Sequence, residues 1–534
     1  GPGVRLFAES IGFDGGRYRI IAFKYPGFEK EGEIFMKKLV SVILGSIFIL
    51  VGSSCAAGGD SSPSASENAV IPDGYTRVDI DDEAKRYKFE GIGAQMDQCL
   101  FSGSYVGLDG IDANITDQDV AVWEERLEYM KIDVTRMCII PDWYELENDN
   151  DDPEVLNEDG FNWNTVKMQC VYKVLDLCKK HDIKMNLSWY GIYPASWNAL
   201  NRDGEAPGWL DLPADDAEFA ESVYAALKHL TEMGYGSVIN EISFYPEPST
   251  EYVRSGGFRR MIEAVDAKLT KEGIREAYCL SGPAEVSDYE IFEEVFQSVG
   301  DLFDRYTGSF YKLRNSNDNA TMKMGMKPFA ELADTAGKAY GVSEFGSNET
   351  TNPPSAAAQM DTDTYRRAMY VARFAINALD SGFTYMSYWV LGNSYYDGTM
   401  MDLGLWKYKN KNWELRPQYY TYSLITRYTD RNSSIYGTDL NEFGNVCMVA
   451  LQNEGGKWTY LLANSGTTQE KLSVVNANFS SGSMDKYEVT ENSIPMDGQT
   501  LGIDKSNTVS VENGALNLII RPNSVMVLTN IAAE

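Results

Sequence analysis

The sequence predicts an α/β fold, a (β/α)8 TIM barrel over about residues 74–430, with a C-terminal all-β sandwich domain over 431–534. Eight short apolar runs alternate with longer amphipathic stretches up to about Tyr428, which is the pattern of repeated βα units. Beyond Tyr428 the β-rich runs are short and separated by Gly, Asn, Asp and Ser, as in a sandwich. A doubly wound sheet is the alternative, but it rarely needs eight such units.

The eight predicted barrel strands are short runs bounded by polar or turn-forming residues. They are Phe89–Gln95, Asp133–Ile139, Lys184–Tyr190, Glu241–Glu247, Ala277–Gly282, Tyr306–Tyr311, Ala339–Gly346 and Phe383–Leu391. Two of the stretches between them place apolar residues at i, i+3, i+4 and i+7, the spacing of one helix face. These residues are Val171, Val174, Leu175 and Cys178 in the first stretch, and Ala368, Val371, Ala372 and Ala375 in the second.

Five β-rich runs after the barrel predict the strands of the sandwich. They are Val446–Leu451, Trp458–Ala463, Lys471–Val475, Leu516–Ile520 and Val525–Leu528. The segment Tyr75–Ile80 precedes the first barrel strand, and we expect it to add one more strand to this domain.

The sequence predicts a targeting signal in the N-terminal region. Residues 36–55 combine a basic start, an uncharged apolar run and small residues before Cys55, and they resemble a bacterial lipoprotein signal peptide with Cys55 as the lipidated residue. A plain cleaved signal is the alternative. Residues 1–35 are interpreted as a non-native or upstream extension, and 56–73, rich in Gly, Ser and Ala, as a flexible linker. The protein is therefore expected to be exported, as an outer-membrane or cell-surface lipoprotein of a bacterium.

Composition excludes several classes of function. With 47 basic and 78 acidic residues the formal net charge is −31, so neither nucleic acid nor an anionic membrane surface is an expected partner, and membrane association would come only through a lipid anchor. The seven Cys form no CxxC pair, only two His are present, and the sequence has neither HExxH nor GxSxG. A zinc hydrolase and a serine esterase therefore have little support, and we expect neither a metal nor a cofactor.

Two glutamates stand where a barrel of this kind carries its chemistry, at the carboxyl ends of strands. Glu247 ends the fourth predicted strand and Glu344 ends the seventh. A carboxylate at the end of an apolar run is costly to bury unless a partner or a function requires it. Such a pair can divide the roles of acid and nucleophile at a glycosidic bond. Glu241 lies six residues before Glu247, roughly 20 Å along the strand, so it belongs to the opposite mouth and is no catalytic partner.

Three further residues are candidate helpers of these glutamates. A guanidinium at Arg136, in the second strand, needs an anion, and a Glu in the barrel mouth would supply it, although a purely structural salt bridge is the alternative. Tyr311 can donate a hydrogen bond to Glu344, or it can be an ordinary interior aromatic. Trp389, on an apolar strand, is by itself more typical of a core residue.

At these residues the chain resembles clan A of the glycoside hydrolases, over about Tyr75 to Glu534. The segments Phe89-Glu90-Gly91-Ile92-Gly93-Ala94 and Pro522-Asn523-Ser524-Val525-Met526-Val527-Leu528 look most like family 30, with families 39 and 5 as relatives. The resemblance implies that Glu247 is the acid/base and Glu344 the nucleophile. It also implies that Arg136 and Tyr311 orient Glu344 and that Trp389 forms the floor of the sugar subsite.

One position departs from the clan pattern. Clan members usually carry Asn directly before the acid/base Glu, and here that position is Pro246. In clan members that Asn binds the 2-hydroxyl group of the sugar. In this chain another residue then has to bind the 2-hydroxyl group, or the substrate differs at that position. Further candidates for sugar contacts follow the strand ends or lie in the next loops, where each alone is more typical of packing or of solvated surface. They are Gln95, Asp97, Trp143, Trp189, Tyr190 and Trp197.

The predicted function is a retaining glycoside hydrolase that cleaves β-linked glycans in oligo- or polysaccharides through a glycosyl-enzyme intermediate on Glu344. Retention predicts a carboxyl separation of about 5 to 5.5 Å between Glu247 and Glu344, whereas about 8 Å would favour inversion. A non-catalytic, surface glycan-binding lipoprotein on a degenerate barrel is the alternative, suggested by Pro246 and by the lipoprotein signal peptide that ends at Cys55. A structural barrel subunit of a larger surface complex is a third interpretation without a positive feature.

Overall fold

The structure is a computed structural model that describes residues 69–532, except for 104–112, 148–149, 151, 190–212, 214, 245–252, 255, 285, 312–317, 347–361 and 397. The predicted extension, signal peptide and lipidated Cys55 lie outside the described residues, as does most of the predicted linker. Among the residues that are described, no helix has the length and apolar character needed to cross a lipid bilayer.

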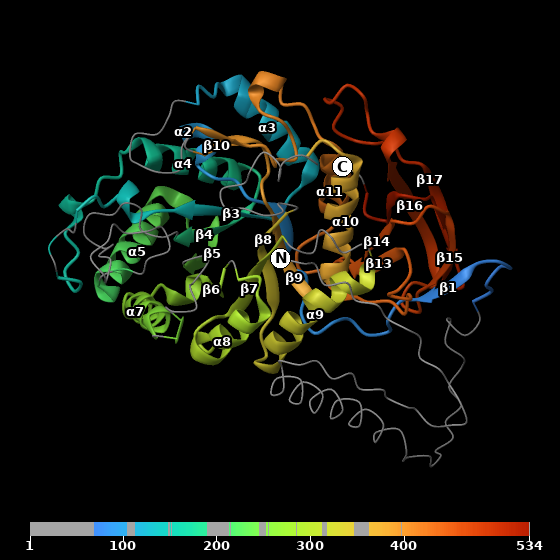
Figure 1. Cartoon of the computed structure of the whole chain (residues 1–534), viewed down its shortest axis with the longest axis horizontal. Coiled ribbons are helices and arrows are strands. Elements are labelled where there is room, and N and C mark those ends of the chain that lie inside the picture. Colours follow the sequence, from blue (N-terminus) through green and yellow to red (C-terminus); the bar gives the residue numbers. More distant parts are fainter. Residues whose placement is uncertain are drawn as a thin grey trace, which may run out of the picture. The chain divides into compact units, whose positions relative to one another are not determined.

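Eight parallel strands close into a barrel in chain order, from β2 to β9 (Figure 1). The predicted (β/α)8 TIM barrel is thus confirmed, and each of the eight predicted runs contributes one strand. The strands are β2 (Gly91–Ala94), β3 (Val134–Ile139), β4 (Lys184–Trp189), β5 (Ile239–Phe244), β6 (Cys279–Gly282), β7 (Arg305–Phe310), β8 (Tyr340–Phe345) and β9 (Phe383–Tyr388).

Helices follow the strands and begin at residues that cap them. Thr116 and Asp119 form a capping box at the start of one helix, and the side chains of Asp215, Asp288 and Asp318 accept backbone N–H groups at three others. The described helices are α2 (Cys99–Ser102), α3 (Asp117–Met130), α4 (Val166–Lys180), α5 (Asp216–Leu230), α7 (Gly257–Lys271), α8 (Tyr289–Val299), α9 (Asn319–Thr335), α10 (Tyr365–Asp380) and α11 (Pro417–Arg427). All eight residues of the two predicted apolar stripes are buried, in α4 and α10.

A second, β-rich region follows the barrel, as predicted. Its strands form one hydrogen-bonded order, β1-β15-β18-β17-β16-β19-β14-β13-β12, in which β1 (Thr76–Asp79) runs parallel to β15 (Glu470–Val475). The sequence patterns did not identify three of these strands, β12, β16 and β17. The remaining strands are β12 (Ser434–Tyr436), β13 (Val446–Gln452), β14 (Trp458–Asn464), β16 (Ser481–Thr490), β17 (Asn507–Glu512), β18 (Ala515–Ile520) and β19 (Ser524–Thr529).

The strands β13 and β14 of this sheet bury both faces. Successive side chains of a strand point to opposite faces, so the cross-strand pair Val449 and Leu461 lies on one face and the pair Met448 and Leu462 on the other. The first pair belongs to the same apolar core as the barrel and its helices, and the second to a separate core inside the β-rich region. Helices α10 and α11 stand between the barrel strands and this sheet (Figure 1).

The first barrel strand depends on a glycine at a close approach of two backbones. A Cβ atom at Gly93 would lie 1.7 Å from the carbonyl oxygen of Val134 on the neighbouring strand. Gly93 is also the residue whose carbonyl accepts a 2.6 Å hydrogen bond from the Tyr422 hydroxyl of α11. The β2–β3 seam therefore has no room for a side chain at this position.

We predict that Gly93→Ala destabilises the protein by about 3 kcal/mol or more, because the methyl group can be accommodated only by moving strand backbones apart. Thermal unfolding followed by circular dichroism measures the loss. Gly455→Ala is the matched control, since its Cβ would meet only the end of the Asn453 side chain, at 3.3 Å. Equal midpoints for the two variants would contradict the prediction.

Candidate active site

Glu344 lies at the carboxyl end of β8 and points into the barrel. The alternation of the strand explains this direction: its neighbour Phe345 points outward and stacks on Phe374 of α10, with ring centroids 4.3 Å apart. The Glu344 side chain is largely buried, with 8% of the residue exposed, and its Oε2 lies 2.8 Å from Nη1 of Arg136. Arg136, on β3, is fully buried. The structure therefore joins two residues that the sequence singled out on separate strands.

Tyr311 holds the second oxygen of the same carboxylate. It follows β7 directly, and its hydroxyl donates a hydrogen bond to Oε1 of Glu344. Gly346 makes this approach possible, because a Cβ there would lie 2.9 Å from the Tyr311 ring and 3.2 Å from the backbone oxygen of Trp389. Both carboxylate oxygens of Glu344 thus face a donor, one cationic and one neutral, and such donors favour the ionised form of a carboxyl group.

A hydrogen-bonded chain extends from Arg136 along the first strand. Nη1 of Arg136 also donates to Oε1 of Gln95 at 3.3 Å, and Nε2 of Gln95 donates to Oδ2 of Asp97 at 2.7 Å. Asp97 further accepts the backbone N–H of Cys138 at 3.2 Å and the hydroxyl of Tyr396. Burial raises the pKa of Asp97, while these donors act in the opposite direction. Gln95 and Asp97, predicted as sugar contacts, are both buried and support Arg136.

Trp389 lies beside these groups at the end of β9. The residue is partly exposed, and its ring meets the ring of Tyr311 edge to face, with centroids 6.0 Å apart, and that of Tyr396 at 6.5 Å. Tyr396 belongs to the hairpin formed by β10 (Ser394–Tyr396) and β11 (Thr399–Met401). Sequence reasoning missed Tyr396, because an aromatic residue in a loop after the last barrel strand carries no distinguishing pattern.

The other predicted contacts are either buried or outside the described residues. Trp189 is fully buried at the end of β4, where its Nε1 donates to the Tyr144 hydroxyl at 3.0 Å, and Trp143 is fully buried as well. Tyr190, Trp197 and Glu247 lie outside the described residues. Strand β5 ends at Phe244, three residues before Glu247.

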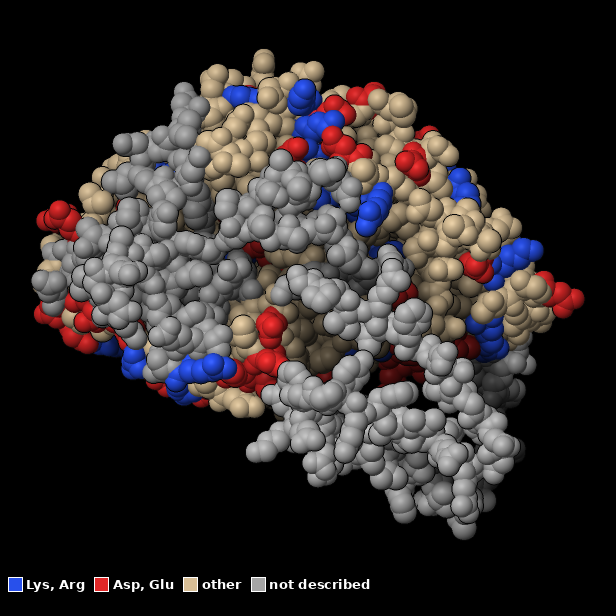
Figure 2. Space-filling view, in the orientation of Figure 1, with Lys and Arg blue, Asp and Glu red and all other residues tan. Residues whose placement is uncertain are grey.

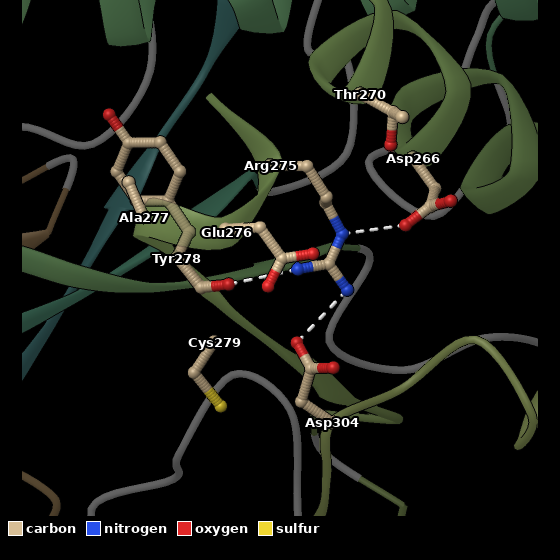
Figure 3. A pocket seen from close by; sticks show the side chains of 8 residues that line it. All are labelled: Asp266, Thr270, Arg275, Glu276, Ala277, Tyr278, Cys279 and Asp304. Atoms are coloured by element: carbon tan, nitrogen blue, oxygen red, sulfur yellow. Dashed lines mark hydrogen bonds and ion pairs between the residues drawn. The ribbon is translucent and has the colours of Figure 1, made fainter. Parts of the chain in front are cut away.

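A hollow of about 400 Å³ lies at the amino ends of the strands, near the start of β6 (Figure 3). Its central side chain is Arg275, whose Nε contacts Asp266 at 2.6 Å, Nη2 contacts Asp304 at 2.9 Å, and Nη1 donates to the backbone oxygen of Tyr278 at 3.0 Å. All three guanidinium nitrogens therefore have partners, which lie on α7 and in the segments that precede β6 and β7. This hollow is not part of the Glu344 site, which lies at the carboxyl ends.

Neither a basic area on the face shown in Figure 2 nor a cluster of metal-ligating side chains is found among the described residues. On the described part of the face shown in Figure 2, Lys and Arg lie interspersed with Asp and Glu instead of gathering in one basic area. Within the described ranges, no three His, Cys, Asp or Glu side chains come together in a way suited to a metal ion.

Comparison with known proteins shows the fold. The structure is similar to a GH30 endoxylanase from Clostridium papyrosolvens C71, with a TM-score of 0.60, 14% identity, and coverage of 86% of this chain and 100% of the other. It is also similar to a glycoside hydrolase family 30 subfamily 8 xylanase from Clostridium acetobutylicum, with a TM-score of 0.58, 13% identity, and coverage of 85% of this chain and 99% of the other. A conserved exported protein from Bacteroides fragilis is similar as well, with a TM-score of 0.58, 12% identity, and coverage of 85% of this chain and 100% of the other. No protein-family model and no curated sequence matches the chain. The fold is thus similar to that of these family 30 glycoside hydrolases, which is the fold that the sequence resemblance predicted.

Asp142 is a buried acid that follows β3, the strand of Arg136, and the sequence did not single it out. It lies in the short 3-10 helix Pro141–Trp143 after β3, is 5% exposed, and its Oδ1 has no hydrogen-bond partner among the described residues. Burial raises the pKa of Asp142 to about 6. Because the folded state then holds the proton more tightly than the unfolded state, this group favours folding below about pH 4. That stabilisation is lost as the pH rises to about 6.

We predict that Asp142→Asn removes this pH dependence, since the amide cannot ionise. Relative to the wild type, the free energy of unfolding of the variant should rise by roughly 1 to 2 kcal/mol between pH 4 and pH 7. Urea unfolding at several pH values measures the difference. Asp117→Asn, on the exposed first turn of α3, serves as the control. A difference that stays constant across this pH range would refute the assignment.

Proposed function

We propose that the protein is a retaining glycoside hydrolase that cleaves β-linked glycans, with Glu344 as the nucleophile and Glu247 as the acid/base. The observation that carries the proposal is the environment of Glu344 at the carboxyl end of a barrel strand. Arg136 and Tyr311 each hold one of its oxygens, while the carboxylate keeps a small exposed fraction. The fold shared with glycoside hydrolases supports the same assignment.

The surroundings of Glu344 suit a nucleophile. A nucleophilic carboxylate has to be ionised and fixed in direction before the substrate arrives. The Arg136 guanidinium places a positive charge 2.8 Å from Oε2 of Glu344. The Tyr311 hydroxyl donates a hydrogen bond to Oε1 and so fixes the orientation of the carboxylate. Each oxygen retains lone-pair capacity beyond these bonds, so it can still attack an anomeric carbon.

Glu247 supplies the complementary role in the proposed reaction. In the first step its carboxyl group would protonate the glycosidic oxygen while Glu344 attacks the anomeric carbon and the glycosidic bond breaks. In the second step Glu247, now ionised, would take a proton from water, which attacks the same carbon and releases Glu344. A carboxyl separation of about 5 to 5.5 Å would fit this double displacement.

The proposed substrate class is an oligo- or polysaccharide, and Trp389 is the proposed floor of the sugar subsite. The residue is partly exposed and its ring adjoins Tyr311, so a sugar stacked on Trp389 would lie next to Glu344. The similar structures include an endo-β1,6-glucanase and an arabinofuranosidase besides the xylanases. Because these activities differ in sugar, we propose no single glycan.

A second candidate function is glycan binding without cleavage. Pro246 occupies the position at which clan members usually carry the Asn that binds the sugar 2-hydroxyl, so one expected contact of the transition state is missing. A barrel that had lost catalysis could keep its binding surface.

Export and lipid anchoring at Cys55 form a further part of the proposal. The basic and apolar segments before Cys55 support it, and one similar structure is a conserved exported protein from Bacteroides fragilis.

We predict that Glu344→Gln lowers kcat by at least about 10³-fold on any β-glycan that the wild type cleaves, because the amide cannot form the glycosyl-enzyme bond. A glycan panel with mass-spectrometric product detection measures turnover. Glu331→Gln, exposed on α9, is the matched control and should keep the wild-type rate. A Glu344→Gln variant with unchanged turnover would exclude the nucleophile assignment.

Isothermal titration with the same oligosaccharides separates the two functions. Tight binding without product formation, unchanged in Glu247→Ala, would favour the non-catalytic binder. Product formation by the wild type that is lost in Glu344→Gln would favour the hydrolase.

Lipidation predicts that cells expressing the full chain incorporate labelled palmitate into the wild type but not into Cys55→Ser, because the acyl chain is attached through the thiol. Detergent partitioning of the two forms provides the second measurement. Label on the Ser variant, or no label on either form, would reject Cys55 as the lipidated residue.

A further inference from the structure

A chain of buried polar side chains runs through the barrel interior from Arg136 to Glu241. Nη2 of Arg136 donates to Oγ of Ser188 at 3.3 Å, and Ser188 Oγ lies 3.0 Å from Oγ of Ser243. Ser243 Oγ lies 2.9 Å from Oδ1 of Asn186, whose Nδ2 donates to Oε1 of Glu241 at 2.7 Å. All five residues are at most 2% exposed. We call Ser188, Ser243 and Asn186 the lumen relay.

With the Ser243 proton assigned to Asn186, the hydrogen bonds of the lumen relay run in one direction, from Arg136 to Glu241. Asn186 turns its amide nitrogen to the Glu241 carboxylate, which can only accept, so its oxygen faces Ser243 and accepts a hydrogen bond from that hydroxyl group. Ser243 has a single hydroxyl proton, so when it donates to Asn186 the 3.0 Å contact between the Ser243 and Ser188 oxygens is made with the Ser188 proton, and the Ser188 oxygen accepts from Arg136. A carboxylate at one end therefore sets the orientation of a donor at the other end.

A second guanidinium neutralises the far end of the chain. Arg305, on β7, forms ion pairs with both Glu241 and Glu90, and its guanidinium stacks over the Tyr385 ring at 4.1 Å from the centroid. Ser281 donates to the same oxygen of Glu241 as Asn186 does. Glu90 directly precedes β2 and is half-exposed, so this end of the chain lies toward the amino ends of the strands.

The relay fixes the rotation of Arg136. A guanidinium is planar, so holding Nη2 at Ser188 also sets the direction of Nη1, which carries the contacts to Glu344 and Gln95. Neutralising the charge of Arg136 would not require the contact with Ser188, because Glu344 already forms an ion pair with Arg136. Branched aliphatic side chains usually fill the interior of such barrels, and here polar groups that are costly to bury occupy it.

We propose that the lumen relay, ended by Glu241, is a positioning device for Arg136 and, through Arg136, for Glu344. The inference rests on the proposed role of Glu344 as the nucleophile and adds four positioning residues to it: Ser188, Ser243, Asn186 and Glu241. None of these residues contacts the substrate in this scheme. They act on the direction from which Arg136 approaches the carboxylate.

Ser243→Ala is the decisive variant, because it breaks the middle of the relay while removing one oxygen atom. We expect kcat on a glycan cleaved by the wild type to fall about 5- to 20-fold, with KM within about twofold, since only the orientation of the nucleophile changes. Glu241→Gln should act in the same direction. Should it fail to fold because Arg305 loses its partner, Ser188→Ala takes its place.

Thr307→Val is the matched control for a lost hydroxyl group in the barrel. Thr307, on β7, is fully buried, and its Oγ1 has no hydrogen-bond partner among the described residues. This variant should keep the wild-type kcat. Equal losses of kcat in Ser243→Ala and Thr307→Val would overturn the proposal, because they would reflect general packing, and so would an unchanged kcat in Ser243→Ala.

Crystal structures of the wild type and Ser243→Ala give a readout that does not depend on the substrate. In the variant, Nη1 of Arg136 should move by about 0.5 Å or more relative to Glu344. If the wild type cleaves no glycan on the panel, the proposed function fails, and this displacement alone decides the relay. An Arg136 guanidinium in the wild-type position would then overturn it.

Discussion

The ion pair between Arg136 and Glu344 is the constraint on which the described part of the site depends. A fully buried guanidinium is costly to desolvate and is tolerated only with an anion and with acceptors for its remaining N–H groups. Glu344 supplies the anion, and Gln95 and Ser188 supply acceptors. The polar residues at these positions of β4, β8 and the end of β2 therefore follow from the presence of one arginine on β3. The same ion pair holds Glu344 in place for chemistry.

A second buried guanidinium, that of Arg305, lies toward the amino end of the barrel and also needs anionic partners. Arg305 is buried between Glu241 and Glu90 and covers the ring of Tyr385, so its charge is balanced by two carboxylates and an aromatic face. Two separate guanidinium centres thus lie in one barrel interior, joined by hydroxyl and amide groups. A ring of aliphatic side chains would pack this interior as densely, but it would not relate the geometry of one end to that of the other.

The sequence predicts the strands and the mouth of the barrel well because both leave local signals. An apolar run that ends in a carboxylate, as at Glu344, marks a strand end, and an arginine on an apolar strand, as at Arg136, requires an anion. Pairing between distant loops leaves no such signal: Tyr396 and Asp97 are 299 residues apart, and although Asp97 follows a predicted strand end, nothing in the sequence points from it to Tyr396. Strands such as β16 and β17 were missed because much of their length is exposed and polar, so their alternation is weak.

The burial of both faces at β13 and β14 argues for a structural role of the β-rich region. One face shares its core with α10, and α10 in turn packs on Phe345, the neighbour of Glu344. The hydroxyl of Tyr365, the first residue of α10, also donates to the backbone oxygen of Val489 in β16. The sheet thus supports the helix on which the outer side of β8 rests. The similar structures cover 85 to 86% of this chain at 12 to 14% identity. Packing that holds a strand end in place tolerates many apolar substitutions, provided that volume and pattern are kept.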